Sequence, residues 1–120
     1  YETIITNFAT GNLKDIKYLL NKKIFEQFNE AIKDRKSKNL LSETTFIGIN
    51  SADIQEHIQN KNMLEVTVNF VSEIISCVRD KDKKIILGDP EKIKKVTDTW
   101  KFCRDTGSNN PNWQLIDTQV

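Results

Sequence analysis

The sequence predicts an α+β fold, in which N-terminal helices pack on a curved, mainly antiparallel sheet of four strands. Apolar residues recur three and four positions apart over the first forty residues, which is typical of amphipathic helices. After Leu41 the apolar period changes to two, as in strands with one buried face. Near the end, alternating runs around Trp100 and Trp113 flank a cluster of Gly, Ser, Asn and Pro, which indicates a β-hairpin. Helices followed by antiparallel strands are characteristic of the α+β class.

Three helices are expected in the first forty residues. The first carries an apolar stripe that starts at Ile4 and ends before Gly11, a residue suited to a helix C-terminus. Asn12 opens a second, short helix. The third repeats apolar residues at amphipathic spacing from Ile24 to Ile32, and it ends among cations, which favour the negative end of the helix dipole.

The strands follow in the second part of the chain. The first covers residues 44–49 and could continue past a break at 50–51 to His57. In the second, apolar and polar residues alternate over 64–70, and both faces become apolar over 71–78. Such a run requires cover on both sides or a β-bulge. Residues 79–84 are expected to form a charged loop and residues 88–90 a turn.

Strand parity predicts which side chains face the helices. The expected core consists of Val68, Phe70, Trp100 and Phe102 on the sheet and Leu20, Phe25, Phe28 and Ile32 on the helices. Because residues 71–78 supply more apolar side chains than one helix layer covers, the helices and the concave sheet should also enclose an apolar pocket. The residues expected to line it are Phe25, Phe28, Phe70, Ile74, Trp100 and Phe102.

Length and charge limit the functions that are possible. The length of 120 residues suits a single domain. With 18 basic against 17 acidic residues the chain is nearly neutral, so it has no overall positive potential that would attract nucleic acid. No apolar run is long enough to span a bilayer, and no signal peptide is recognisable. Because Tyr1 already precedes a helical pattern, the chain is expected to be part of a longer protein, whose preceding region could hold a membrane-associating segment.

Neither a metal site nor a cofactor site is predicted. His57 is the only histidine, and Cys77 and Cys103 lack the paired spacing of zinc ligands. Both cysteines fall in predicted strands, at positions that suit small buried side chains, so they are expected to be reduced thiols.

Asp98 is the one candidate for acid–base chemistry. It shares strand parity with Trp100 and Phe102, so it should face the apolar side, where an unpaired carboxylate could act as a general base. The structural alternative is that Asp98 pairs with Arg104 or Arg79. Because only Tyr18 offers itself as a second catalytic group, the structural role is favoured and no catalytic residue is assigned.

Two basic clusters could contact an anionic surface. One is Lys33, Arg35, Lys36 and Lys38 at the end of the third helix; the other consists of Lys81, Lys83, Lys84, Lys92, Lys94 and Lys95. Such runs of charged residues usually form a face that contacts only solvent, and acidic neighbours lower the net positive charge of both clusters. If they converge, each suitably placed cation contributes about 1 kcal/mol of attraction to anionic lipid. Nucleic acid is disfavoured because no aromatic residues interleave with the lysines.

Several motifs resemble a known family. Residues 96–105 read VTDTWKFCRD and residues 109–116 read NNPNWQLI; upstream stand TTFIGI at 44–49, FVSEIIS at 70–76, RDKD at 79–82 and GDP at 88–90. In order and spacing these are similar to the Tim44-like domain family, found in the mitochondrial import-motor anchor and its alphaproteobacterial relatives. The α+β layout also resembles the nuclear-transport-factor-two superfamily, which includes isomerases and dehydratases. The resemblance implies one cone-shaped domain over residues 1–120, with an apolar pocket, working at a membrane rather than as an enzyme.

Three functions remain open at this stage. The first is a non-catalytic module that binds anionic, cardiolipin-like lipid or a partner protein of a translocation or insertion system. The second is a pocket enzyme that uses Asp98, and the third is a pure protein-interaction scaffold. Spare apolar surface and the lack of paired acid–base groups favour the first and third. The resemblance implies an inner membrane, and the lysine-, isoleucine- and asparagine-rich composition favours a bacterial one over the mitochondrial matrix side.

Overall fold

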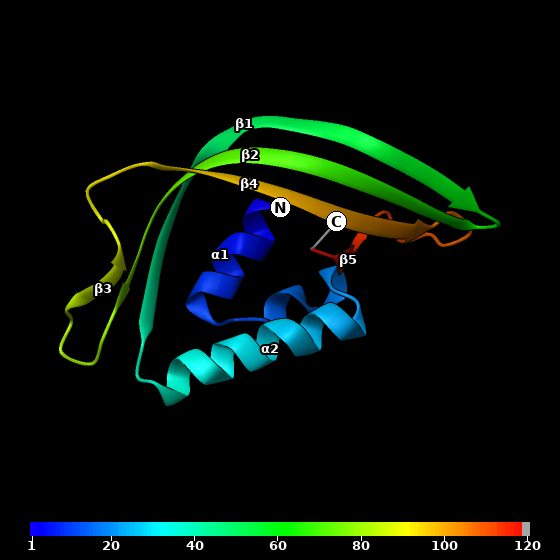
Figure 1. Ribbon diagram of the computed structural model, residues 1–120. Helices are drawn as coiled ribbons and strands as arrows, with labels where there is room; N and C mark the ends of the chain where they lie inside the picture. The colour runs from blue at the N-terminus through cyan, green and yellow to red at the C-terminus, as the bar shows by residue number, and fades with distance from the viewer. Residues whose placement is uncertain (119–120) are drawn as a thin grey trace.

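A computed structural model describes residues 1–118 of the chain. Three N-terminal helices lie under one face of a long curved sheet (Figure 1). The helices are α1 (Glu2–Thr10), the 3-10 helix η1 (Lys14–Leu19) and α2 (Lys22–Ser37). The strands are β1 (Leu41–Asn60), β2 (Met63–Arg79), β3 (Ile85–Gly88), β4 (Lys94–Asp105) and β5 (Gln114–Asp117). The predicted α+β architecture is confirmed.

The helix ends follow local chemistry. Gly11 closes α1 in the left-handed conformation at a φ of 83°, as predicted from its place after the apolar stripe. Asn21 caps α2, where its side-chain oxygen accepts a hydrogen bond from the amide of Ile24 at 2.9 Å. The second helix is a 3-10 helix that begins after Leu13, so the prediction that Asn12 opens it is wrong by one residue; Asn12 instead donates its side-chain amide to Asp15.

The sheet is antiparallel, in the order β1-β2-β4-β5. Strand β2 pairs with β1 along its whole length; on its other side, residues 63–74 pair with β4 and residues 77–79 with β3. The sequence predicts four strands, and β3 is the additional one. The expected break in β1 at residues 50–51 is a bulge, since the register shifts between Ile49 and Ser51 while the strand continues to Asn60.

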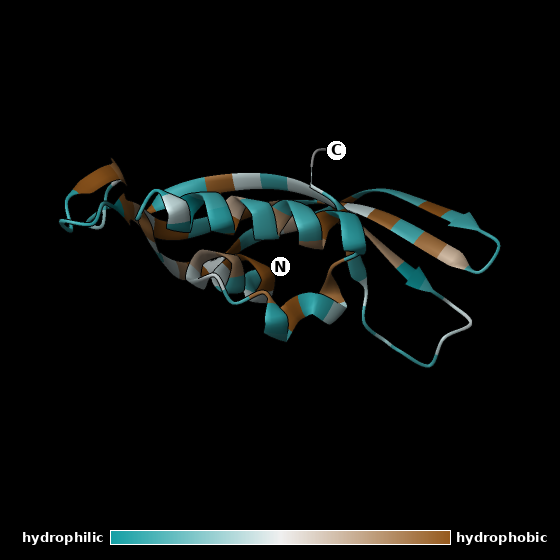
Figure 2. Cartoon of the chain, turned by 90° about the horizontal axis from the view of Figure 1, so that it is seen from below, coloured by the Kyte–Doolittle hydropathy of each residue, from teal (hydrophilic) through white to brown (hydrophobic). Residues whose placement is uncertain are grey.

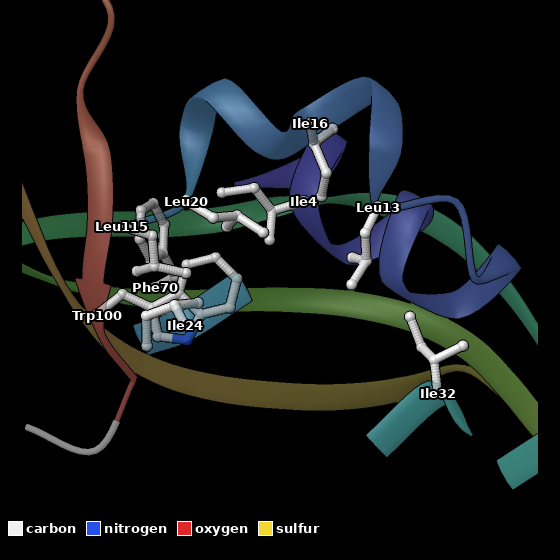
Figure 3. Packing of buried hydrophobic residues seen from close by; sticks show 9 residues of the cluster. All are labelled: Ile4, Leu13, Ile16, Leu20, Ile24, Ile32, Phe70, Trp100 and Leu115. Atoms are coloured by element: carbon white, nitrogen blue, oxygen red, sulfur yellow. The ribbon is translucent and has the colours of Figure 1, made fainter. Parts of the chain in front are cut away.

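The core lies between the helices and the concave face of the sheet. Phe70 and Trp100 contribute to it from β2 and β4, and Leu115 from β5 is fully buried (Figure 3). From the helices come Ile4, Leu13, Ile16, Leu20, Ile24 and Ile32. Val68, Phe102, Phe25 and Phe28 pack against this cluster while partly exposed, so all eight predicted core residues contribute to it.

Trp113 differs from its predicted place. It lies just before β5, which begins at Gln114, and its side chain is half-buried. The strand is therefore not centred on this tryptophan, and the buried residue of β5 is Leu115. Among the described residues, no helix combines the length and apolar character needed to cross a bilayer.

Candidate functional site

Of the six residues predicted to line one pocket, four lie around three different cavities, and Phe70 and Ile74 line none of the three. Phe102 lines the first cavity, at the end of the sheet near the β1–β2 hairpin. Phe28 and Trp100 line the second, between α1, α2 and β4. Phe25 lines the third, beside Leu20 and Gln114. Phe70 is buried in the core, and Ile74 pairs with Phe46 and Lys94 on the concave face.

The first cavity, called here the hairpin-end cavity, is almost wholly apolar. Its volume is about 340 Å³, and it is lined by Ile54, Val66, Val68, Phe102 and Trp113. Val66 stands opposite Phe102 on β4, and Val68 stands opposite Ile54 on β1, which places these four on one face. Because β1 and β2 extend beyond the helices here, this part of the concave face has no helix over it (Figure 1).

The second cavity contains Asp98. It measures about 330 Å³, and its other lining residues are Ile4, Ile5, Phe8, Phe28, Trp100 and Thr118. The hydroxyl of Tyr1 donates a hydrogen bond to Asp98 Oδ2 at 2.6 Å. The same hydroxyl oxygen lies 3.1 Å from Ser72 Oγ; because its single proton is directed to Asp98, Ser72 is the donor in that contact.

Tyr1 is held in place by aromatic rings. Its ring stacks on Phe70 at a centroid distance of 4.2 Å and lies 4.7 Å from the ring of Trp100. Burial, reinforced by the hydrogen bond to Asp98, raises the pKa of Tyr1 to about 12. At neutral pH the phenol therefore keeps its proton and acts as a hydrogen-bond donor.

Asp98 does not have the partner that the sequence suggested. Arg79 pairs with Glu43, and Arg104 donates from Nε to the carbonyl of Asn110 at 3.3 Å, so the predicted pairing of Asp98 with either arginine is wrong. The tyrosine beside Asp98 is Tyr1, whereas Tyr18 is exposed on η1. This 97-residue separation has no signature in the sequence; only the position of α1 under β4 brings Tyr1 to Asp98.

The second basic cluster lies at the opposite end of the sheet from the hairpin. β3 and the two loops around it, residues 80–93, are called here the arm (Figures 1 and 2). All six lysines of the cluster, in the arm and at the start of β4, are exposed: Lys81, Lys83, Lys84, Lys92, Lys94 and Lys95. Within residues 1–118, none of the six forms an ion pair shorter than 4.0 Å.

Two acidic residues of the arm turn toward its own backbone. Asp80 Oδ1 accepts hydrogen bonds from the amides of Asp82 and Lys84, each at 2.9 Å, and Asp89 Oδ1 accepts from the amide of Glu91 at 2.8 Å. These carboxylates shape the turns. The lysine ammonium groups therefore face solvent without a carboxylate bound to them.

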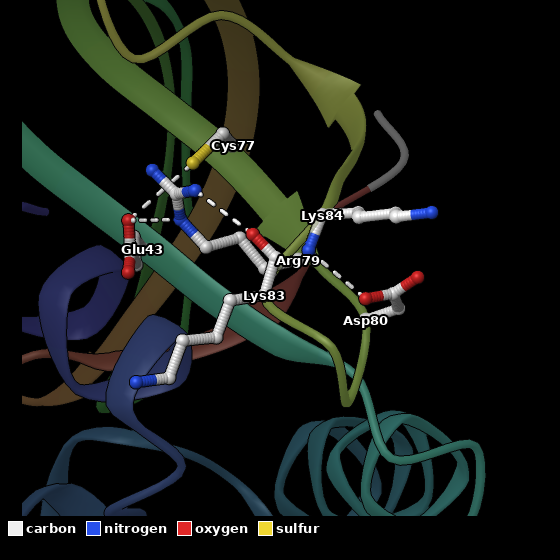
Figure 4. Close-up of polar contacts among 6 residues, drawn as sticks. All are labelled: Glu43, Cys77, Arg79, Asp80, Lys83 and Lys84. Atoms are coloured by element: carbon white, nitrogen blue, oxygen red, sulfur yellow. Dashed lines mark hydrogen bonds and ion pairs between the residues drawn. The ribbon is translucent and has the colours of Figure 1, made fainter.

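A polar clamp fixes the root of the arm. Arg79 donates from Nε to Glu43 Oε2 at 3.1 Å and from a terminal nitrogen to the carbonyl of Lys83, also at 3.1 Å (Figure 4). The hydrogen bond from Arg79 lowers the pKa of Glu43. Burial, with the nearby Glu43 carboxylate, raises the pKa of the Cys77 thiol, which is therefore protonated at neutral pH. The clamp joins β1, β2 and the loop before β3.

The arm and the hairpin-end cavity are distinct sites. Cys77, which pairs with β3, is eleven residues along β2 from Val66, which lines the cavity, and at the usual rise that is about 36 Å of strand. Lys95, at the start of β4, stands opposite Glu73, five residues or about 17 Å of strand from Val68. The molecule itself is 52 Å long. A lipid whose acyl chain occupied this cavity could not place its headgroup on the arm.

The remaining candidate groups offer little chemistry. Cys77 is buried, Cys103 is partly buried, and both are free thiols, as predicted. Burial also raises the pKa of Cys103. Over residues 1–118, no three His, Cys, Asp or Glu side chains gather closely enough to hold a metal ion.

Sequence reasoning missed three features. The four residues of β3 are too few to show a period, although three consecutive large apolar residues between lysines could have indicated an exposed apolar segment. Ile54 reaches the cavity because β1 continues through two register shifts, between Phe46 and Gly48 and between Ile49 and Ser51, before Ile54 stands opposite Val68. The Tyr1–Asp98 hydrogen bond depends on tertiary packing alone.

Comparisons with known proteins agree with the resemblance in the motifs. The chain is 22% identical over 116 residues to the human mitochondrial import inner membrane translocase subunit TIM44, a match that covers 95% of this chain and 26% of the human protein. It is 20% identical over 120 residues to the probable mitochondrial import inner membrane translocase subunit tin-44 of Caenorhabditis elegans, covering 98% of this chain and 28% of that protein. The chain thus spans about a quarter of the length of these relatives.

Solved structures support the fold. The intermembrane space region of the chloroplast protein ARC6 superposes with a TM-score of 0.59 at 12% identity, covering 96% of this chain and 82% of that one. At such low identity the likeness concerns the fold alone. The Tim44-like domain family matches residues 1–120. The chain therefore belongs to the Tim44-like domain family.

Proposed function

We propose that this domain is a non-catalytic, membrane-associated module of a protein-translocation or membrane-protein-biogenesis system, which contacts anionic lipid and tethers a partner protein at an inner membrane. The relatives named as translocase subunits support the translocation role and the inner membrane. The composition favours a bacterial inner membrane, and the matrix face of the mitochondrial inner membrane is the alternative.

The observation that carries the proposal is the unpaired lysine cluster at one end of an elongated molecule. Residues 79–95 contain seven basic and four acidic residues, whereas the whole chain has a net charge of only +1. Because this lysine cluster lies at one end of the sheet, it can approach an anionic bilayer while the hairpin end of the domain stays clear. A cardiolipin-like lipid is a suitable partner, since anionic headgroups attract clustered lysines at about 1 kcal/mol each.

An enzymatic role for Asp98 has less support. Its hydrogen-bond partner Tyr1 has a pKa near 12, far above the range in which a general base or acid works at neutral pH. The other residues around the cavity are apolar apart from Thr118, so no second titratable side chain faces Asp98 across it. The Tyr1–Asp98–Ser72 contacts instead fix the start of α1 on the sheet.

The hairpin-end cavity favours a role in tethering. It is apolar, open and separate from the arm, so it suits an apolar side-chain cluster of a partner protein. A domain that contacts lipid at one end and an apolar ligand at the other would hold a partner at a defined distance from the membrane.

Flotation with lipid vesicles tests the lipid part of the proposal. The protein should float with phosphatidylcholine vesicles that contain cardiolipin and remain unbound with phosphatidylcholine alone. Binding should weaken as salt rises, because exposed charges are screened over about 8–10 Å near physiological ionic strength. Reversing Lys92, Lys94 and Lys95 to glutamate should abolish binding.

A matched variant controls for net charge. Lys14, Lys22 and Lys23 are also exposed lysines and lie on the helices, and reversing them changes the net charge by the same amount. The helix reversal should float as the parent does. Equal loss of binding in both reversals, or binding that ignores salt, would contradict a role for the cluster in lipid contact.

A further inference from the structure

The arm carries exposed apolar side chains in the middle of its lysines. Ile85, Ile86 and Leu87 of β3 are 45%, 53% and 69% exposed. Figure 2 shows this strand as an apolar segment at one end of the molecule, beside hydrophilic loops. Large apolar side chains that are clustered, exposed and rimmed by charge usually mark a contact surface.

The packing of β3 leaves these side chains without a core to join. β3 pairs only with β2, through residues 77–79, and its other edge is unpaired. The register shifts between Val78, opposite Leu87, and Arg79, opposite Ile85, so Ile86 is the extra residue of a bulge. A bulge and nearby lysines protect an edge strand from pairing with another chain, but they do not bury its apolar side chains.

The arm is nevertheless a defined structure. Gly88 has a φ of 80°, and a Cβ atom there would lie 2.3 Å from the carbonyl oxygen of Ser76, so only glycine lets β3 approach β2 so closely. The clamp from Arg79 to Glu43 and to the Lys83 carbonyl holds the preceding loop. The exposed apolar residues are therefore presented on an anchored hairpin.

We infer that the tip of β3, Ile85–Leu87, inserts into the interface of an anionic bilayer while the surrounding lysines bind the headgroups. Charge complementarity selects this occupant. The six lysines lack carboxylate partners among the described residues, and residues 79–95 contain seven basic against four acidic residues, so the surroundings of the apolar tip carry a net positive charge. An anionic bilayer offers negative headgroups directly above an apolar layer, which matches both features at one planar surface.

The shape of the molecule permits this contact. The arm lies at the end of the sheet opposite the hairpin, beyond the C-terminal end of α2, so a flat surface can meet it from that end (Figures 1 and 2). Lysine side chains are long enough to hold their ammonium groups at headgroup level while their apolar stems lie beside the inserted residues. The inference rests on the proposed function. It adds to the electrostatic contact with lipid an apolar contact that salt does not weaken.

A pair of matched double variants tests the insertion. Ile86→Gln with Leu87→Gln removes the apolar tip and keeps every lysine. Ile54→Gln with Ile58→Gln changes two residues at the hairpin end whose exposures, 68% and 42%, are similar. The binding constants of both variants and the parent for cardiolipin-containing phosphatidylcholine vesicles are measured by flotation at low and high salt.

The tip variant should bind at least about tenfold more weakly than the parent, since losing the burial of even one large aliphatic side chain is worth about that factor. It should also lose the binding that the parent retains at high salt, because apolar insertion is not screened. The hairpin-end variant should bind as the parent does. In a second measurement, lipids brominated on the acyl chain should quench the fluorescence of Leu87→Trp and leave Ile54→Trp unquenched.

The outcomes separate the inference from the proposed function. If the parent binds and the lysine reversal does not, but the tip variant matches the parent at both salt concentrations, insertion is wrong and electrostatic docking stands. If the parent ignores anionic vesicles, the lipid part of the proposed function fails as well. If the tip variant alone stops a self-association of the parent and binds vesicles unchanged, the tip is a protein interface and the inference is overturned.

Discussion

At the β1–β2 hairpin end, the concave face of the sheet is apolar and hollow, whereas at the arm end apolar residues stand exposed among unpaired lysines. Both ends reach beyond the helices and share strand β2. A curved sheet can therefore present two chemically different surfaces, one at each end, when only its central part forms the core. The hollow end suits a ligand that enters the protein, and the arm suits a surface that the protein enters.

The largest expected effect comes from the core that both ends share. Trp100 is 6% exposed and contacts the rings of Tyr1, Phe70 and Phe102. Trp100→Ala should cost about 3–5 kcal/mol of unfolding free energy. Trp113→Ala, at the half-buried edge of the hairpin-end cavity, should cost clearly less. Urea unfolding followed by circular dichroism measures both losses of stability. Equal urea midpoints for the two variants would contradict the prediction that Trp100 in the core contributes more to stability than Trp113 at the cavity.

The second-largest loss of stability should be confined to the arm. Gly88→Ala forces a Cβ against the backbone of Ser76 and a left-handed conformation on alanine, at a cost of about 1–3 kcal/mol. Gly48→Ala is the matched control, since nothing lies within 4 Å of its added Cβ. Amide exchange should accelerate in β3 and the paired end of β2 and stay unchanged at the hairpin. Faster exchange at both ends would mean that the arm and the hairpin do not unfold independently.

A smaller effect is expected midway between the two ends. Tyr1→Phe removes the hydrogen bond to Asp98 and should cost about 1 kcal/mol near neutral pH. Because folding raises the pKa of Tyr1 from 10.0 to about 12, the contribution of its phenol is complete below pH 10 and is lost as the pH rises through 12. The difference in urea midpoint between parent and variant should therefore shrink above pH 10. A constant difference would contradict this role.

The smallest effect concerns the clamp at the root of the arm. The hydrogen bond from Arg79 lowers the pKa of Glu43 below its ordinary value of 4.5, so the clamp is complete above that pH and weakens as the pH falls. Glu43→Gln should leave global stability almost unchanged, since exposed ion pairs contribute little. It should speed amide exchange in the loop before β3. A nuclear magnetic resonance titration of Glu43 that shows an ordinary pKa would argue against the clamp.

Part of this arrangement could be predicted from the sequence. Period-two alternation placed Val68, Phe70, Trp100 and Phe102 on one face, because each lies in a stretch of strand long enough to show its parity. The lysines were identified, but not their distance from the apolar cavity, because separation along a curved strand depends on pairing register. Ile54 was missed because two register shifts in β1 separate it from residues 44–49, where the alternation could be followed, and Tyr1 because its contact with Asp98 exists only after α1 has docked.

The central claim is that membrane contact occurs at the arm and leaves the hairpin end free. Hydrogen exchange of the vesicle-bound protein, compared with the free protein, tests it directly at single segments. On vesicles containing cardiolipin, exchange should slow at residues 80–95 and remain unchanged around Ile54, Val66 and Trp113. Slowed exchange around the hairpin-end cavity with an unaffected arm would contradict the account, because it would place the lipid at the other end of the sheet.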